Sequence, residues 1–173
     1  MEKRVIPIKN YLIFAMVAIT SFGVVYNVAG WYKNVREEMN NTSIMPSVIS
    51  EILSDELNNY LVDNASPVIY MASSKDKEIK TFEKEFKKLI INNEIADQII
   101  YLDTSKIFDQ TFYTKLITKY FSKQLIDNKV TLDTIPNIMI FKDREVVSVL
   151  YKTNQSINKN TVELFLVVNE VIE

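Results

Sequence analysis

The sequence predicts an α/β fold, with a central mixed sheet of about four strands flanked by helices, preceded by one transmembrane helix. Three observations predict it. An uncharged apolar stretch of 21 residues lies near the N-terminus, at 11–31. Beyond it, helical spacing of apolar residues alternates with short apolar runs of strand length. The last two runs are joined by three residues, as in an antiparallel hairpin. Strands that alternate with helices imply parallel crossover connections.

The first elements in chain order are a short flank at 1–10 and the transmembrane helix at 11–32. A helix of this length rises about 1.5 Å per residue and crosses a hydrocarbon core of about 30 Å. Tyr11, Trp31 and Tyr32 lie towards its ends, as interfacial aromatic residues do. Two other interpretations are a cleaved signal peptide, which the length and the poor small-residue sites disfavour, and a buried core helix, which the missing polar face disfavours.

Positive charges predict the orientation of this helix. Lys3, Arg4 and Lys9 precede it, whereas Lys33 and Arg36 follow it. The small excess on the N-terminal side favours a cytoplasmic N-terminus. We therefore expect a single-pass, signal-anchored protein of the cell membrane whose C-terminal domain is extracytoplasmic. Lysine outnumbers arginine 17 to 3, a bias typical of an A+T-rich bacterial genome.

A polar stem is predicted at 33–46, and a folded domain at 47–173. Asn40, Asn41, Thr42, Ser43 and Pro46 interrupt the helical pattern, so the boundary is placed there. The domain then alternates in the order α-β-α-β-α-β-β-α. Its expected helices and strands lie at 47–61, 66–72, 75–91, 98–102, 109–125, 137–141, 145–151 and 158–171.

Composition excludes several kinds of chemistry. The 173 residues include no Cys and no His, which rules out disulfides, thiol catalysis and Cys/His zinc sites. The two glycines, Gly23 and Gly30, both lie in the N-terminal apolar stretch, so no glycine-rich phosphate-binding loop is present. A net charge of −2 gives no bulk attraction to nucleic acid. We expect no cofactor, no bound metal and no nucleic-acid partner.

Two stretches resemble the thioredoxin-like superfamily, as does the order of the elements. The first is IYMASSKDKEIKTFEKEF at 69–86, where Lys80, Phe82 and Glu83 match the residues after the family's Cys-x-x-Cys. The alignment then places Asp76 and Ile79 at the two cysteine positions. The second is TIPNIMIF at 134–141, followed by KDREVV, which resembles the family's cis-proline strand and the hairpin beyond it.

The resemblance implies a redox-inactive domain. Both cysteines are absent, and Tyr70 stands where active members carry a buried acid, six positions before the first cysteine. Asp76 has a sufficient structural role beside a positive helix end, with Ser73 and Ser74 as N-caps. Ile79 is in phase with apolar neighbours and is expected in the core. Thiol–disulfide exchange is not available to such a chain, and we expect no enzymatic activity.

The binding feature that the resemblance retains is the loop at Thr134, Ile135 and Pro136. In the family, the backbone before a cis proline pairs with an extended peptide, so Ile135 would offer its N–H and C=O. The alternative is that Pro136 only opens a strand and serves the fold alone.

The favoured function is therefore a membrane-anchored protein-interaction or accessory module. It resembles the membrane-anchored, bacteriocin-transport accessory thioredoxin-like proteins, which suggests a role in secretion or bacteriocin export, with the lipid bilayer and a protein as partners. One alternative is a non-catalytic subunit of a thiol–disulfide oxidoreductase system. Another is an enzyme of unrelated chemistry, which a pocket holding two carboxyl groups with separated pKa values would support.

Overall fold

The computed structural model describes residues 7–41, 43–76, 79–151 and 157–173. The chain divides into two compact units, Met1–Asn40 and Asn41–Glu173.

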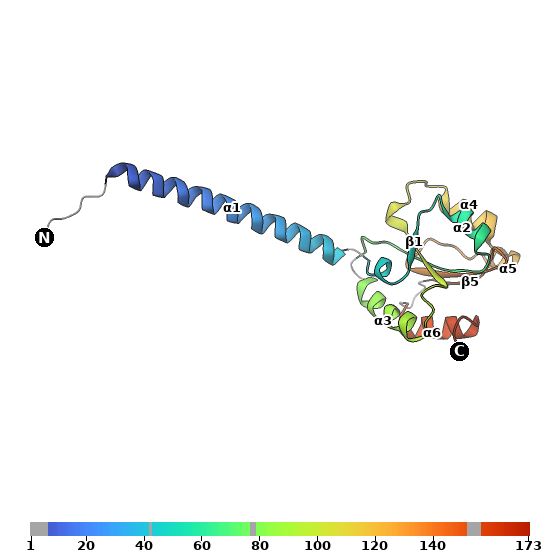
Figure 1. Cartoon of the computed structure of the whole chain (residues 1–173). Helices are drawn as coiled ribbons and strands as arrows, with labels where there is room; N and C mark the ends of the chain where they lie inside the picture. Colours follow the sequence, from blue (N-terminus) through green and yellow to red (C-terminus); the bar gives the residue numbers. More distant parts are fainter. Residues whose placement is uncertain (1–6, 42, 77–78, 152–156) are drawn as a thin grey trace. The chain divides into compact units, whose positions relative to one another are not determined.

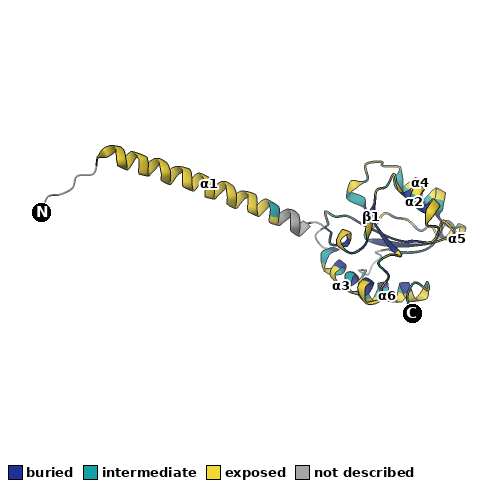
Figure 2. Cartoon of the chain, in the orientation of Figure 1, coloured by how far each residue is buried: buried dark blue, intermediate teal, exposed yellow. Residues whose placement is uncertain are grey.

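Among the described residues, the first unit consists of one long helix, α1 (Ile8–Asn41), and its large apolar side chains between Ile8 and Tyr32 are exposed (Figures 1 and 2). Its polar residues bond back to the helix. The Thr20 and Ser21 hydroxyls donate to carbonyls one turn earlier, and the Asn27 amide donates to the Gly23 carbonyl at 2.7 Å. These bonds satisfy the polar groups without water. The stretch Ile8–Arg36 is long and apolar enough to cross a membrane.

The second unit begins earlier than the expected boundary at residue 47. α1 continues to Asn41, and the 3-10 helix η1 (Met45–Ser47) follows almost at once. Met45 is fully buried in the core, and Ser43 is buried as well. The segment predicted as the end of a polar stem therefore packs against the domain, because Met45 and Ile49 supply apolar surface to it. We call residues 43–49 the strap.

The predicted helix at 47–61 is wrong in its first half. This segment forms strand β1 (Ser50–Ile52), a turn, and helix α2 (Leu57–Asp63). The other strands are β2 (Val68–Ala72), β3 (Ile99–Asp103), β4 (Asn137–Lys142) and β5 (Glu145–Tyr151). β1 pairs in parallel with β3 along Ser50–Ile100, Glu51–Tyr101 and Ile52–Leu102. Its three residues are too few to show a strand period, and the apolar residues on either side give helical spacing by coincidence.

Five strands, rather than about four, form one mixed sheet in the order β1-β3-β2-β4-β5. β2 is central, parallel to β3 and antiparallel to β4. This order and these directions are those of the thioredoxin-like fold. β2 and β3 are buried at every residue, which explains their continuous apolar sequences.

Helices cover both faces of the sheet (Figure 1). α3 (Ile79–Asn92) and α6 (Lys159–Val168) pack with the strap on one face. α2 and α4 (Phe112–Tyr120) cover the other face. The single helix predicted at 109–125 is interrupted at Phe121, which forms a bridge with Val146 of β5 before α5 (Lys123–Asp127) begins. This change of direction allows Phe121 to be buried.

Candidate functional site

The residues singled out from the sequence lie at one edge of the sheet. Met71, near the end of β2, is paired with Asn137, the first residue of β4. The loop that follows β2, with Ser73 to Asp76, and the loop that ends at Pro136 therefore lie at the same edge. The end of β3 joins them there, because Ala72 is paired with Asp103. The topology thus brings the two predicted regions together.

The positions aligned with the cysteines have ordinary structural environments. Asp76 is half-buried, and its backbone N–H donates to the Ser73 carbonyl at 3.1 Å. Ile79 is the first residue of α3 and is buried in the core. The two residues between them, Lys77 and Glu78, lie outside the described residues. Ile79 therefore contributes an apolar contact to the core, as its phase with the apolar residues of this helix predicted.

Two serines and one buried aspartate hold the loop after β2. Asp103 Oδ1 accepts the backbone N–H groups of Ser74 at 3.0 Å and of Ser105 at 2.9 Å. The Ser74 and Ser105 hydroxyls are 2.8 Å apart. Burial would raise the pKa of Asp103, but these hydrogen bonds outweigh it, and the pKa is lowered. These bonds hold Ser74 at the end of β3. Ser73 Oγ accepts the Lys75 N–H at 3.3 Å.

The Thr134–Pro136 loop lies beside this edge. The peptide bond between Ile135 and Pro136 is cis, the isomer that the resemblance implies. Both residues are half-buried, and Thr134 is exposed. The Asn137 amide donates to the Thr134 carbonyl at 3.2 Å and so holds the loop against β4. Within the described parts of the chain, neither the N–H nor the C=O of Ile135 has a hydrogen-bond partner.

A buried carboxyl group was not expected from the sequence. Glu83 of α3 has no exposed surface. Its Oε1 accepts the Ser43 hydroxyl at 2.7 Å and the Tyr70 hydroxyl at 3.2 Å, and its Oε2 accepts the Ile44 N–H at 3.0 Å. One side chain therefore joins the strap, the central strand β2 and α3. Three donors around two oxygens are an arrangement that suits an ionised carboxylate.

Burial and hydrogen bonding act against each other at Glu83. Desolvation raises its pKa, while the bonds from Ser43, Ile44 and Tyr70 and the charge of Lys80 lower it. Desolvation prevails, so the pKa lies above its ordinary value. Glu83 in turn raises the pKa of Tyr70, which burial already raises more strongly. The sequence did contain a signal: Glu83 falls in the apolar stripe of α3, between Ile79 and Phe86.

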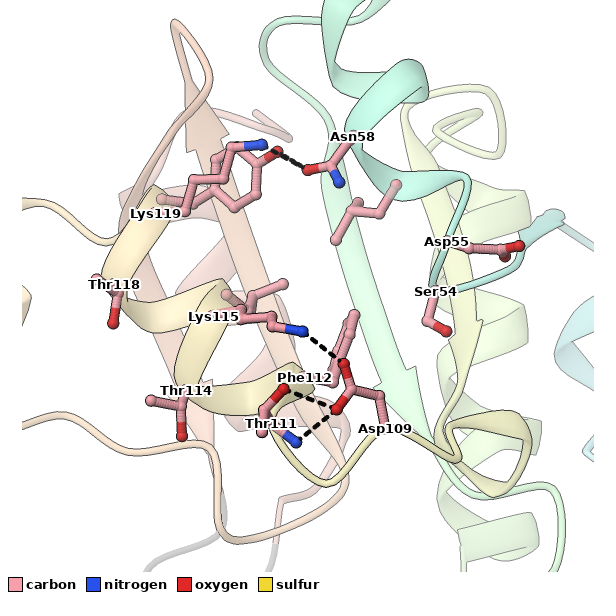
Figure 3. Close-up of a pocket in the computed structure, with 13 residues that line it drawn as sticks. Ser54, Asp55, Asn58, Asp109, Thr111, Phe112, Thr114, Lys115, Thr118 and Lys119 are labelled. Atoms are coloured by element: carbon pink, nitrogen blue, oxygen red, sulfur yellow. Dashed lines mark hydrogen bonds and ion pairs between the residues drawn. The ribbon is translucent and has the colours of Figure 1, made fainter.

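A pocket of about 730 Å³ lies between α2 and α4 (Figure 3). At one end, the Lys119 ammonium donates to Asn58 Oδ1 at 2.8 Å, and the Tyr120 hydroxyl donates to the same oxygen. At the other end, Asp109 accepts from Lys115 at 2.9 Å and from Thr111.

These bonds leave the pocket without an evident acid–base pair. Lys115 and Thr111 lower the pKa of Asp109 to about 2, so its carboxylate stays ionised at neutral pH. The other lining carboxylate is Asp55, on the α2 side. A general acid needs a pKa near the working pH, and Asp109 moves away from it. Asp109 therefore does not fit the role of a general acid in this pocket.

Comparisons with solved structures identify thioredoxin-fold proteins. A protein with a thioredoxin fold matches with 14% identity over 69% of this chain and 95% of its own, with a TM-score of 0.48. Mitochondrial thioredoxin 3 from Saccharomyces cerevisiae has 14% identity, over 73% and 98% of the two chains, with a TM-score of 0.44. Thioredoxin f2 from Chlamydomonas reinhardtii has 12% identity, over 70% and 94%, with a TM-score of 0.45.

No protein-family model and no curated protein matched the sequence. The similarity to solved structures concerns the fold, and a fold hosts many functions. Only the residues of this chain therefore bear on its function.

Proposed function

We propose that this protein is a membrane-anchored, redox-inactive thioredoxin-like module that binds an extended polypeptide of a partner protein. The observation that supports it most directly is the Ile135 backbone. Its N–H and C=O have no partner within the described residues, at a half-buried position on the same sheet edge as Ser74 and Asp76. An unpaired backbone of this kind is suited to one or two main-chain hydrogen bonds from a peptide strand.

The absence of cysteine supports a binding role over thiol exchange. Exchange requires an attacking thiolate, and this chain contains none. Asp103, Ser74 and Ser105 hold the neighbouring loop in a fixed arrangement, so a peptide would meet a preorganised surface. The pathway we favour is secretion or bacteriocin export, with the domain on the extracytoplasmic side of the cell membrane.

The membrane helix would give this binding site a practical advantage. α1 contains a stretch long and apolar enough to span a bilayer. A weak interaction with a partner in the same membrane becomes effective when both are held at the surface, because tethering raises the effective concentration. One or two backbone hydrogen bonds could then suffice for recognition.

Site-specific photocrosslinking tests the proposal. A photoreactive amino acid replaces Ile135 in the full-length protein, in its native cells. The matched control carries it at Ile126 of α5, an exposed isoleucine whose helix lies near the start of β5, at the opposite edge of the sheet. We expect a discrete protein adduct at Ile135 that is absent at Ile126.

The adduct pattern separates the alternatives. The same adducts at both positions, or none at Ile135, would contradict the binding proposal and leave Pro136 as a feature of the fold. A Cys-x-x-Cys protein in the adduct would favour the non-catalytic subunit of a thiol–disulfide system. A transport or secretion protein would favour the accessory role.

A further inference from the structure

Helix α6 is apolar on two sides. Val162 and Leu166 have no exposed surface and face the sheet. On the outward side, Leu164 is 64% exposed, Val168 is 71% exposed and Val167 is 41% exposed. These three residues follow the i, i+3, i+4 spacing of one helix stripe. The outward side of a helix that covers a sheet is normally polar, so this stripe is a second apolar surface.

The neighbouring helix α3 adds exposed lysine and isoleucine side chains on the same side of the sheet. α3 and α6 lie side by side on the same face of the sheet (Figure 1). Three exposed residues of α3 share one side of the helix, because they are spaced by four and then three positions: Lys84, Lys88 and Ile91. Ile91 is 54% exposed. We call these six residues the α6–α3 face: Leu164, Val167, Val168, Ile91, Lys84 and Lys88.

The charges near this face favour an anionic surface as its partner. Lys84 has no carboxylate partner within the described residues. Lys88 pairs with Glu85 at 3.0 Å. Both side chains are about half exposed, so this ion pair is weak and competes little with the binding of Lys88 to an anionic surface. Glu170, beyond the end of α6, approaches Lys142 at 3.8 Å. Exposed lysines next to exposed aliphatic side chains are the composition of surfaces that bind the bilayer interface.

The length of the connecting chain puts a bilayer within reach. From Trp31 to Asn41, α1 continues for ten residues, which rise about 15 Å. A domain of 133 residues has a radius of gyration of about 14 Å. A domain of this size, joined to the membrane segment by so short a connection, stays close enough to a bilayer to touch its surface.

We propose that the α6–α3 face docks on the surface of the bilayer that α1 spans. Leu164, Val167, Val168 and Ile91 enter the interfacial region, and Lys84 and Lys88 lie at anionic headgroups. The inference rests on the membrane anchoring in the proposed function and is independent of peptide binding at Ile135. Docking would confine the domain to a limited set of orientations on the membrane.

The absence of cysteine makes a direct test available. Single variants Leu164→Cys, Val168→Cys and Ile126→Cys are labelled with an environment-sensitive fluorophore in the full-length protein. Each is reconstituted in vesicles of phosphatidylcholine, with or without phosphatidylglycerol. We expect lipid-borne nitroxides to quench the labels at 164 and 168 several-fold more strongly than the label at 126. Aqueous iodide should show the reverse order.

Trp31, the chain's only tryptophan, reports anchoring separately. Quenching of Trp31 by lipid-borne nitroxides, with the labels at 164 and 168 as open to iodide as the label at 126, would overturn docking while leaving the anchor intact. An unquenched Trp31 would contradict the anchor itself. Labels shielded from both quenchers in a dimeric protein would assign the face to a second copy and overturn docking.

A charge reversal tests the lysines. The double variant Lys84→Glu, Lys88→Glu should lower lipid quenching at position 164 in vesicles with phosphatidylglycerol and leave it unchanged in pure phosphatidylcholine. The control is Lys123→Glu on α5, an exposed lysine on the other face of the domain. An equal effect of both substitutions would overturn the assignment of Lys84 and Lys88 to headgroups.

Discussion

At the scale of single residues, Glu83 connects three segments of the domain, namely the strap, β2 and α3. The resemblance predicts that Tyr70 takes the place of a buried acid, and in the structure the Tyr70 hydroxyl donates to the carboxylate of Glu83 in α3. An acid is thus present in the core, but its other partners are Ser43 and Ile44 of the strap. These hydrogen bonds attach the strap to the sheet.

Removing this carboxylate should destabilise the domain markedly. Glu83→Ala leaves the Ser43 and Tyr70 hydroxyls and the Ile44 N–H without their acceptor, which should cost about 2–4 kcal/mol of unfolding free energy. Glu83→Gln keeps an acceptor and should cost about half as much. Urea unfolding followed by near-UV circular dichroism measures both.

The matched control for these variants is Glu85→Ala, two residues along the same helix. Glu85 makes one exposed ion pair with Lys88, so its removal should change the unfolding free energy by less than about 0.5 kcal/mol. Equal stabilities for Glu83→Ala and Glu85→Ala would refute the structural role of Glu83.

Glu83 also predicts a pH dependence of stability. Burial holds its pKa in the folded state above the ordinary value of 4.5. Just above pH 4.5 the folded state retains a proton that the unfolded state has released, so stability falls as pH rises through the raised pKa and returns on acidification. Asp103 has a lowered pKa and acts in the opposite sense: its contribution to stability is lost as the pH falls below 3.8, the ordinary pKa of an aspartate.

Comparison with Glu83→Gln isolates this contribution. The free energy of unfolding of the wild type minus that of the variant should decrease between pH 4.5 and neutrality. A difference that stays constant over this range would show that Glu83 has the same pKa in both states.

At the scale of elements, the sequence predicted most strands and helices but not how the chain enters the domain. β2 and β3 were predictable because strands buried on both faces give uninterrupted apolar runs. β1 was not, since its three residues are stabilised by pairing with β3, a contact distant in sequence. Phe121 likewise interrupts the helix expected at 109–125 because it bridges to Val146.

The candidate site was predictable only in part, because some of its contacts join segments that are distant in sequence. Ile135 and Pro136 were identified by a local motif, and strand pairing between β2 and β4 brings them to the edge where Ser74 and Asp76 lie. The partners of Glu83 come from segments 39 and 13 residues away, which periodicity alone cannot connect. The pocket between α2 and α4 depends on helix packing in the same way.

The N-cap of α6 should contribute measurably to the free energy of unfolding. Asn158 caps α6: its side chain accepts the Thr161 N–H at 3.1 Å, and its own N–H donates to the Thr161 hydroxyl at 3.0 Å. Asn158→Ala should lower the free energy of unfolding by about 1 kcal/mol.

The comparison is Ser122→Ala at the cap of α5. Ser122 accepts the Leu125 N–H at the longer distance of 3.4 Å, and α5 has five residues. We expect a loss below about 0.5 kcal/mol. Thermal unfolding of the two variants side by side tests the ranking, and a larger loss for Ser122→Ala would contradict it.

At the scale of the whole molecule, function depends on which side of the membrane the second unit occupies. The positive charges at Lys3, Arg4 and Lys9 predict an extracytoplasmic domain. Cysteine accessibility tests this in intact cells. A membrane-impermeant maleimide should label Gln110→Cys, in an exposed loop of the domain, and should label Glu2→Cys only after permeabilisation.

The cause of this orientation can be tested in the same assay. Neutralising Lys3, Arg4 and Lys9 together leaves Lys33 and Arg36 as the positive flank, which should lower the fraction of molecules labelled at Gln110→Cys. Labelling of Glu2→Cys alone in intact cells would reverse the predicted topology. The Ile135 loop and the α6–α3 face would then meet cytoplasmic polypeptides and the cytoplasmic leaflet, whose anionic lipids would still suit Lys84 and Lys88. The peptide site would then bind a cytoplasmic polypeptide, or a secreted polypeptide before it crosses the membrane.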